Sequence, residues 1–206
     1  VPGLQISQNT SISGAYRSGY TSTLTMIGKI DTLIYEDMSF KDIEIDIHSS
    51  KIADSTDVLA SVYLYSDRQN VGNFNPTEYL LFEGIWDKSH VDFFFRVEEN
   101  NTNSQVEVQG ELAFLVNKSE LVLNSSDLLA LGQPWKISNA NKITFENGEV
   151  QIDSLRIYHE GEYVAVNGTI SRDPDQTLRI DFSNFQLQNL NPVFLYDMEG
   201  AAYGNA

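Results

Sequence analysis

Apolar and polar residues alternate along most of this chain, which predicts β-strands with one dry face and one wet face. Within residues 41–47, isoleucines occupy every second position, and Asp42, Glu44 and Asp46 lie between them. Successive side chains of a strand point to opposite faces, so the isoleucines share one side. The same alternation predicts strands at 20–27, 30–36, 58–65, 91–97, 104–109, 111–116, 119–124, 142–145, 149–152, 154–158, 162–170, 176–182 and 184–188.

Turn signals separate these strands, and helix signals are few. Segments rich in Asn, Asp, Gly and Pro lie at 98–102, 146–148, 160–161 and 172–175. We predict one short helix at residues 191–200, where Asn191 can cap, Pro192 takes the first helical position and Gly200 follows the end. Residues 76–83 fit either a turn of helix or a strand. The pattern therefore indicates an all-β antiparallel meander.

A sheet of so many one-sided strands must cover its apolar face. It can pack on a second sheet as a β-sandwich, close into a barrel, or curl over on itself, and alternation alone does not choose among these. Residues 1–206 contain no Gly/Ser/Pro-rich linker, so we predict a single β-rich segment. The chain begins Val-Pro-Gly without a signal segment, which suggests a piece excised from a longer protein.

Composition excludes several kinds of function. The formal net charge is −16 and no cluster of Lys and Arg offsets it locally, so nucleic acid is a poor partner. Without cysteine, the chain can form neither a disulfide nor a thiolate metal site. The longest apolar run, residues 112–116, is far shorter than the ~20 residues of a membrane-spanning helix.

Catalytic signatures are missing, and we predict neither enzymatic activity, nor a cofactor, nor a metal site. The histidines, His48, His90 and His159, lie far apart among polar neighbours. Glu44 and Asp46 would stand roughly 6.6 Å apart on a strand, close to the spacing of an inverting glycosidase. They point toward water, however, where nothing would raise the pKa of either carboxyl for work as a general acid.

Two binding alternatives remain open at this level. A polar loop at residues 67–75 could bind Ca²⁺, but it offers a single carboxylate. We therefore favour a polar loop without a bound ion. Tyr63 and Tyr65 share a strand face, and Trp86 adds a further large ring, so stacking on sugars is conceivable. The corresponding alternative function is a β-sandwich binding module for polysaccharide or a protein partner.

An ordered series of weak motifs runs along the chain, most clearly from about residue 130 onward. Its members are Trp135-Lys-Ile137, Asn141-Lys-Ile-Thr-Phe145, Val150-Gln-Ile-Asp-Ser-Leu-Arg-Ile157, Val164-Ala-Val-Asn-Gly-Thr-Ile-Ser171, Leu178-Arg-Ile-Asp-Phe182, Leu187-Gln-Asn-Leu-Asn-Pro192 and Gly200-Ala-Ala-Tyr-Gly204, preceded by Gly14-Ala-Tyr16, Tyr20-Thr-Ser-Thr-Leu24 and Leu33-Ile-Tyr-Glu-Asp37. This series resembles the TamB family of the AsmA-like superfamily, in the variant found in Bacteroidetes.

The resemblance implies a fold, a place and a function. The fold would be an elongated, curled antiparallel sheet, the β-taco, with a concave interior lined by aliphatic and aromatic side chains. The protein would lie in the periplasm, tethered to the inner membrane through a segment absent from this chain, and would partner an Omp85-type outer-membrane barrel. Its function would be phospholipid transport between the membranes, help in outer-membrane protein assembly, or both.

The residue pattern agrees with such a carrier, because sheltering acyl chains from water requires apolar walls and no catalytic group. A sheet cut from longer neighbours would also expose edge strands, so self-association through an edge is possible. The alternative for the apolar positions is a closed sandwich core. The side chains that we expect to line a lipid groove are Ile43, Ile45, Ile47, Phe93, Phe95, Val106, Val108, Leu112, Phe114, Leu121, Leu123, Ile143, Phe145, Val164, Val166, Leu178, Ile180 and Phe182.

Overall fold

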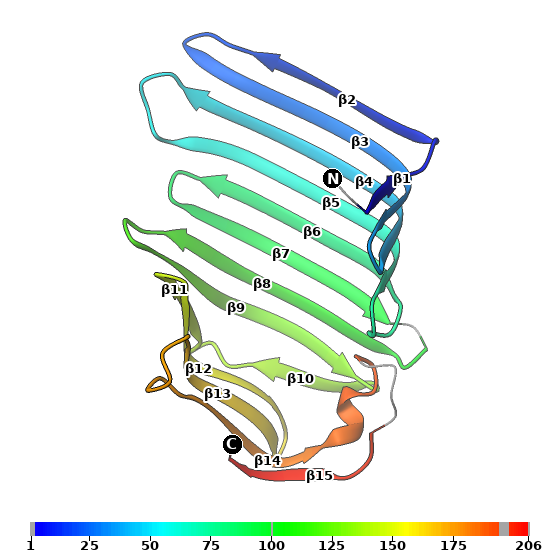
Figure 1. The fold of residues 1–206 in the computed structure, drawn as a ribbon, viewed down its shortest axis with the longest axis vertical. Helices are drawn as coiled ribbons and strands as arrows, with labels where there is room; N and C mark the ends of the chain where they lie inside the picture. The colour runs from blue at the N-terminus through cyan, green and yellow to red at the C-terminus, as the bar shows by residue number, and fades with distance from the viewer. Residues whose placement is uncertain (1–2, 100, 194–197, 206) are drawn as a thin grey trace. The chain divides into compact units, whose positions relative to one another are not determined.

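The computed structural model describes residues 3–99, 101–193 and 198–205, and in this part the chain is all-β apart from one short 3₁₀ turn. Figure 1 shows the strands in their order along the chain. The chain divides into two compact units, which we call unit 1 (Val1–Asn100) and unit 2 (Asn101–Ala206). The boundary falls within the turn segment predicted at 98–102.

Unit 1 is one antiparallel sheet in which β3 to β7 pair in sequence order. The short strand β1 and the strand β2 both pair with β3, along different parts of its length. Among the described residues β2 has a strand neighbour on one side only, and edge-strand self-association stays a prediction. The strands are β1 (Leu4–Ile6), β2 (Thr10–Arg17), β3 (Thr21–Tyr35), β4 (Met38–Ile52), β5 (Val58–Val71), β6 (Thr77–Asp87) and β7 (His90–Glu99).

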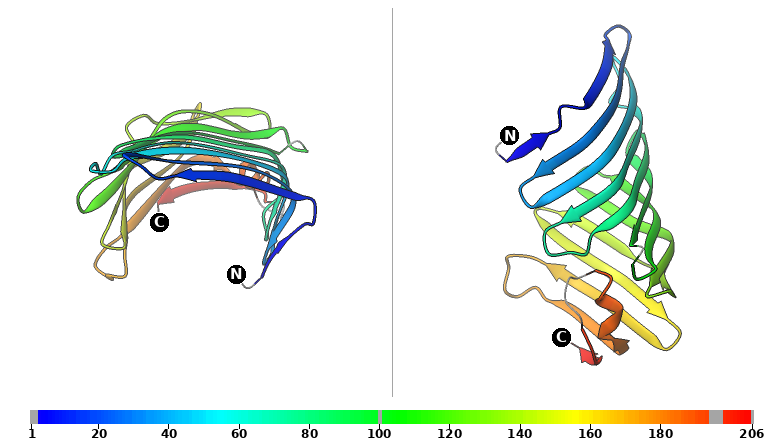
Figure 2. Two further views of the ribbon diagram at one scale, coloured as in Figure 1. Left: turned by 90° about the horizontal axis from the view of Figure 1, so that it is seen from above. Right: turned by 90° about the vertical axis from the view of Figure 1, so that its right-hand side faces the viewer.

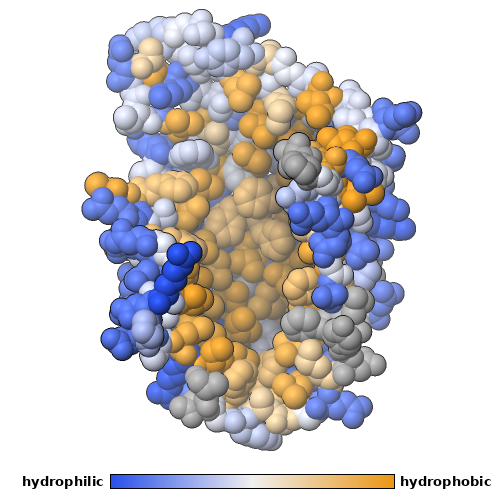
Figure 3. Space-filling view, in the orientation of Figure 1, coloured by the Kyte–Doolittle hydropathy of each residue, from blue (hydrophilic) through white to orange (hydrophobic). Residues whose placement is uncertain are grey.

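One face of unit 1 is apolar across the five long strands. A single row of register partners crosses β3 to β7 through Gly28, Ile45, Leu64, Phe82 and Phe95. We call this side the inner face of unit 1. Figure 2 shows the strands of this unit curving, and in Figure 3 apolar residues gather in the hollow over their middle while polar residues follow the margins.

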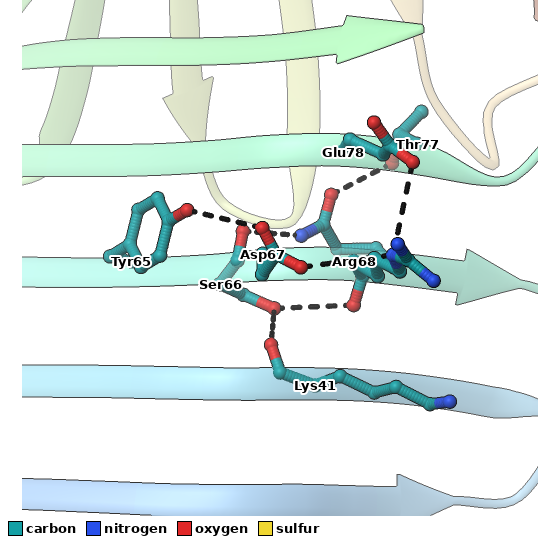
Figure 4. A network of polar contacts seen from close by, with 8 residues as sticks. Lys41, Tyr65, Ser66, Asp67, Arg68, Thr77 and Glu78 are labelled. Atoms are coloured by element: carbon teal, nitrogen blue, oxygen red, sulfur yellow. Dashed lines mark hydrogen bonds and ion pairs between the residues drawn. The ribbon is translucent and has the colours of Figure 1, made fainter. Parts of the chain in front are cut away.

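The curvature of unit 1 has a local cause. Asp42 and Tyr79 adopt positive φ angles, of 50° and 51°, and the β6–β7 register shifts beside Tyr79. Such irregularities bend a strand without ending it. The fully buried Ser66 links β5 to β4 at the bend, because its hydroxyl donates to the backbone oxygen of Lys41 at 2.9 Å, as Figure 4 shows. The side-chain amide of Gln69 in turn donates to the Ser66 carbonyl at 2.7 Å.

The strands of unit 2 are also antiparallel, and β9 and β12 are bridged by two short strands, β10 and β11, that each pair with both of them. The remaining strands pair in sequence order. The strands are β8 (Ser104–Phe114), β9 (Lys118–Ala130), β10 (Gln133–Ile137), β11 (Lys142–Glu146), β12 (Glu149–His159), β13 (Glu162–Ile170), β14 (Leu178–Gln186) and β15 (Ala201–Asn205), and the 3₁₀ turn η1 (Leu187–Leu190) follows β14.

Each unit is a single curled layer and not a sandwich. Two packed sheets bury large apolar side chains between them. Here the fully buried side chain among the described residues is that of Ser66, and the buried apolar residues are few: Ile30, Ile43, Val108, Trp135, Ile152 and Phe185. The prediction of an all-β, curled antiparallel sheet with one-sided apolar strands is confirmed, and the sandwich alternative describes neither unit.

The observed strands are longer than the predicted ones. The segments predicted separately at 20–27 and 30–36 form the single strand β3, and 104–109 and 111–116 form β8. Likewise 149–152 and 154–158 join in β12, and 176–182 and 184–188 largely join in β14. At Ser154 and Asn184 the chain takes a positive φ, of 55° and 48°, and the register shifts nearby. A bulge interrupts the alternation of apolar and polar residues in the sequence, but the strand continues to pair with its neighbour beyond the bulge.

Other segments differ from their predictions or resolve them. Residues 77–83 belong to strand β6, which settles the choice left open for 76–83. The supposed loop at 67–75 begins inside β5, which runs to Val71. In the predicted helix at 191–200, residues 191–193 form turns instead, and residues 194–197 lie outside the described part. Strands β1, β2, β10 and β15 were not among the strands predicted from alternation, because they are short or lack a clean apolar period.

Candidate functional site

The residues of unit 1 that we predicted to line a lipid groove all lie on its inner face. Ile45 pairs with Leu64, and Ile43 and Ile47 flank Ile45 at two-residue spacing on β4. On β7, Phe93 and Phe95 pair with Gly84 and Phe82, and the Phe82 and Phe93 rings stack with centroids 6.4 Å apart. The alternation in the sequence thus identified this face correctly. It did not identify Leu64 and Phe82, which supply its middle, although their spacing in β5 and β6 carries the same period.

The residues of unit 2 that we predicted to line a lipid groove also share one face, which we call the inner face of unit 2. One row of register partners crosses β8, β9, β11 and β12 through Leu112, Leu121, Ile143 and Ile152. Further along, Val164 pairs with Phe182 and Val166 with Ile180. By register and two-residue spacing the same face holds the other predicted residues, Val106, Val108, Phe114, Leu123, Phe145 and Leu178.

One end of the inner face of unit 2 is closed by aromatic rings. Trp135 on β10 and Phe185 on β14 meet edge to face at 5.6 Å, although β12 and β13 lie between their strands in the sheet. The sheet is therefore curled tightly enough here for inner-face side chains of non-neighbouring strands to touch. Phe182 lies 6.2 Å from Phe185, and the His159 ring lies 5.5 Å from Trp135. We call Trp135, His159, Phe182 and Phe185 the aromatic floor.

Polar groups hold the aromatic floor in place. The Nδ1 of His159 lies 2.6 Å from the carbonyl oxygen of Pro134, which can only accept, so this nitrogen carries the proton. Glu162 accepts hydrogen bonds through Oε2 from the backbone of Gln186, at 3.3 Å, and from the side chain of Asn189, at 3.1 Å. These bonds fix the end of β14, where Phe185 lies. The indole N–H of Trp135 is buried and has no hydrogen-bond partner among the described residues.

The opposite end of the inner face of unit 2 is open. Phe114, Phe145 and Ile170 lie in one register row, through Ser119 and Val150, and they are 40%, 41% and 51% exposed. Trp135 and Phe185 in the aromatic floor are only 4% and 7% exposed. We call the row of Phe114, Phe145 and Ile170 the open edge. The face thus runs from large exposed apolar side chains to a sealed cluster of rings.

Charged pairs lie on the outer faces of both units. Lys29 Nζ lies 2.6 Å from Glu44 Oε1, and this hydrogen bond raises the pKa of Lys29. The equivalent bond from Lys118 lowers the pKa of Glu120. Asp46 contacts His48 at 2.8 Å on the same outer face as Glu44. The side chains of Glu44 and Asp46 are 47% and 43% exposed on this outer face, and no apolar wall surrounds them that would prepare a general acid.

The aromatic residues considered for sugar binding lie on opposite faces. Tyr65 is on the outer face of unit 1, where it packs edge to face on Tyr79 at 5.5 Å. Burial raises the pKa of both Tyr63 and Tyr65. Trp86 pairs with Ala60 and Val91 on the inner face, and its indole donates to the Lys88 carbonyl at 2.9 Å. Trp86 therefore cannot join Tyr63 and Tyr65 in one stacking surface.

No group of three or more His, Cys, Asp or Glu side chains within the described part of the chain is arranged to hold a metal ion. No helix in that part has the length and apolar character needed to cross a membrane. Comparison with protein-family models, with curated proteins and with solved structures gave no match.

Proposed function

We propose that this chain is a non-enzymatic carrier segment whose inner faces shelter the acyl chains of phospholipids. The observation that carries the proposal is the open edge of unit 2, where Phe114, Phe145 and Ile170 remain exposed on a concave apolar face. Soluble proteins rarely leave such a patch uncovered unless it binds something. Each CH₂ group moved from water onto these walls contributes about 0.8 kcal/mol, and this gain needs no polar recognition.

Unit 1 supports the same proposal independently. Its row of Ile45, Leu64, Phe82 and Phe95 gives an apolar wall on one layer of sheet, while Lys29 and Glu44 pair on the other side. The acidic excess keeps the outer faces wet and discourages aggregation. An enzyme would need activated side chains on the walled side, and the wall is built from aliphatic and aromatic groups.

The resemblance to the TamB family supplies the biological setting of the proposal. In that setting the chain is part of a periplasmic bridge, tethered to the inner membrane and partnered by an Omp85-type outer-membrane barrel. Its cargo is phospholipid, and the same apolar faces can hold the alternate apolar side chains of an outer-membrane protein strand before assembly. The motifs behind the resemblance include Trp135 in β10 and Phe145 in β11, both on the inner face of unit 2.

Two neighbouring residues of β13 test the proposal. Ile170 lies on the inner face and Thr169, which pairs with Gln151, lies on the outer face. Ile170→Asp places a carboxylate against the acyl chains, whereas Thr169→Asp places the same charge on the opposite, outer face of the sheet. We expect Ile170→Asp to weaken binding of a fluorescent phosphatidylethanolamine by about tenfold or more, and Thr169→Asp to leave it unchanged.

The measurement is a titration of the purified chain with the fluorescent phospholipid, with circular dichroism as the check on folding. Phe114→Asp, at the other side of the open edge, is expected to behave like Ile170→Asp. Equal affinity of both β13 variants, or no binding by the unsubstituted chain, would contradict the proposed function.

A further inference from the structure

The inner face of unit 2 has a direction, because its two ends differ. The open edge exposes Phe114, Phe145 and Ile170, whereas Trp135 and Phe185 seal the aromatic floor. Along β13 the face runs from Ile170 past Val166 to Val164, and Val164 pairs with Phe182 of the floor. Six residues at about 3.3 Å each make this path roughly 20 Å long.

Charge decides which end of a lipid can reach the floor. The carboxylate of Glu162 lies beside the floor, bonded to the backbone of Gln186, the residue after Phe185. An anionic phosphate or carboxylate brought there would face a like charge in a part-buried place. Terminal methyl groups carry no such penalty and pack well against aromatic rings.

The indole N–H of Trp135 is a group of the floor that could favour the opposite orientation. It has no hydrogen-bond partner among the described residues, so an acceptor on a ligand would satisfy it. It is also completely buried, however, so that no ligand atom reaches it while Trp135 and Phe185 stay in contact.

We propose that the aromatic floor is a stop for acyl chains: lipids enter unit 2 methyl end first from the open edge, and the terminal methyl rests on the rings of Trp135, Phe182 and Phe185. This inference rests on the proposed function. It adds an orientation to the bound lipid and assigns the floor a specificity role, since chains longer than the path leave part of their length outside.

Fluorescence quenching tests the orientation without disturbing the floor. In Trp86→Phe, which removes the other tryptophan of the sequence, Trp135 is the sole indole reporter. The probes are stearic acids that carry a doxyl quencher either beside the carboxylate or beside the terminal methyl. We expect the methyl-end probe to quench Trp135 several-fold more strongly, because its label lies at the floor. A phosphatidylcholine bearing the same labelled chain shows whether a phospholipid and a free fatty acid enter alike.

The outcomes separate the orientation from the proposed function. Stronger quenching by the carboxylate-end probe, or equal quenching by both probes when both bind, overturns the orientation and leaves the lipid-binding proposal standing. Failure of every probe to bind, measured by the loss of doxyl mobility in electron paramagnetic resonance, overturns the proposed function itself.

A matched pair of floor variants tests the stop. Trp135→Phe keeps a ring and removes the N–H, whereas Trp135→Leu shortens the side chain at the sealed end. We expect Trp135→Leu to shift the preference several-fold from laurate toward behenate and Trp135→Phe to keep the original order. Loss of fatty-acid binding in a folded Trp135→Phe variant would instead make the N–H a ligand contact and refute the methyl-first orientation.

Discussion

At the scale of single residues, the structure separates side chains that bend the sheets from side chains that line them. Ser66 and Gln69 are polar and buried, and they hold backbone groups where strands of unit 1 turn away from a flat sheet. Ile45 and Phe95 are apolar and half-buried on the inner face. The polar residues therefore shape the concave surface, while the apolar residues give it its affinity for hydrocarbon.

Ser66→Ala tests the shaping role. The substitution removes the hydroxyl that donates to the Lys41 carbonyl, and it leaves this acceptor without its side-chain donor at a fully buried position. We expect a loss of about 1–2 kcal/mol in the free energy of unfolding, measured by urea denaturation. Ser61→Ala on the same strand, at an exposed position, is the control and should change stability by less than ~0.5 kcal/mol. Equal stability of the two variants would refute the role of Ser66.

At the scale of strands, bulges explain both the curl of the sheet and why the alternation in the sequence does not predict the face of every side chain. Phe182 and Phe185 are three residues apart, so strict alternation places them on opposite faces of β14. The positive φ at Asn184 and the register shift between the two phenylalanines bring both rings into the aromatic floor. Pairing of β10 with both β9 and β12 then carries Trp135 to the same place.

Glycines in the strands provide a matched test of these close approaches. A Cβ on Gly168 of β13 would lie 2.2 Å from the Thr177 carbonyl oxygen, and its φ of +120° disfavours any other residue. Gly28 of β3 has an ordinary φ, and its nearest neighbour would be Ile12 Cγ1 at 3.5 Å. We expect Gly168→Ala to destabilise by ~2 kcal/mol or more and Gly28→Ala to be neutral or to stabilise by up to about 1 kcal/mol. Thermal denaturation checks both, and the reverse order would contradict the described strand packing.

The part of the site that was predictable from the sequence is the part that obeys a period of two. Ile43, Ile45 and Ile47 share a face because nothing interrupts their alternation, and the predicted residues of β8, β9 and β13 follow the same rule. The aromatic floor was not predictable, because Trp135 stands beside a proline in a five-residue strand and meets Phe185 only through the curl of the sheet. Local pattern specifies faces, whereas curvature depends on bulges and on contacts between distant strands.

At the scale of the whole molecule, the central feature is a chain organised as single curled layers instead of packed double layers. In each unit, half-buried apolar side chains cover one face, and exposed ion pairs such as Lys29–Glu44 and Arg179–Asp181 lie on the other. A folded protein gains stability by burying such a face against itself. Leaving it concave and uncovered is reasonable where a hydrocarbon ligand completes the core, as we propose.

Photo-crosslinking from three adjacent phenylalanines of β7 tests this central claim most directly. Phe93 and Phe95 lie on the inner face, whereas Phe94, which pairs with Glu83, lies between them on the outer face. Replacement of each in turn by benzoylphenylalanine changes neither the strand nor the aromatic character of the position. Irradiation with radiolabelled phospholipid vesicles is expected to label the chain from positions 93 and 95 and not from position 94. Labelling from all three positions alike, or from 94 alone, would contradict the account.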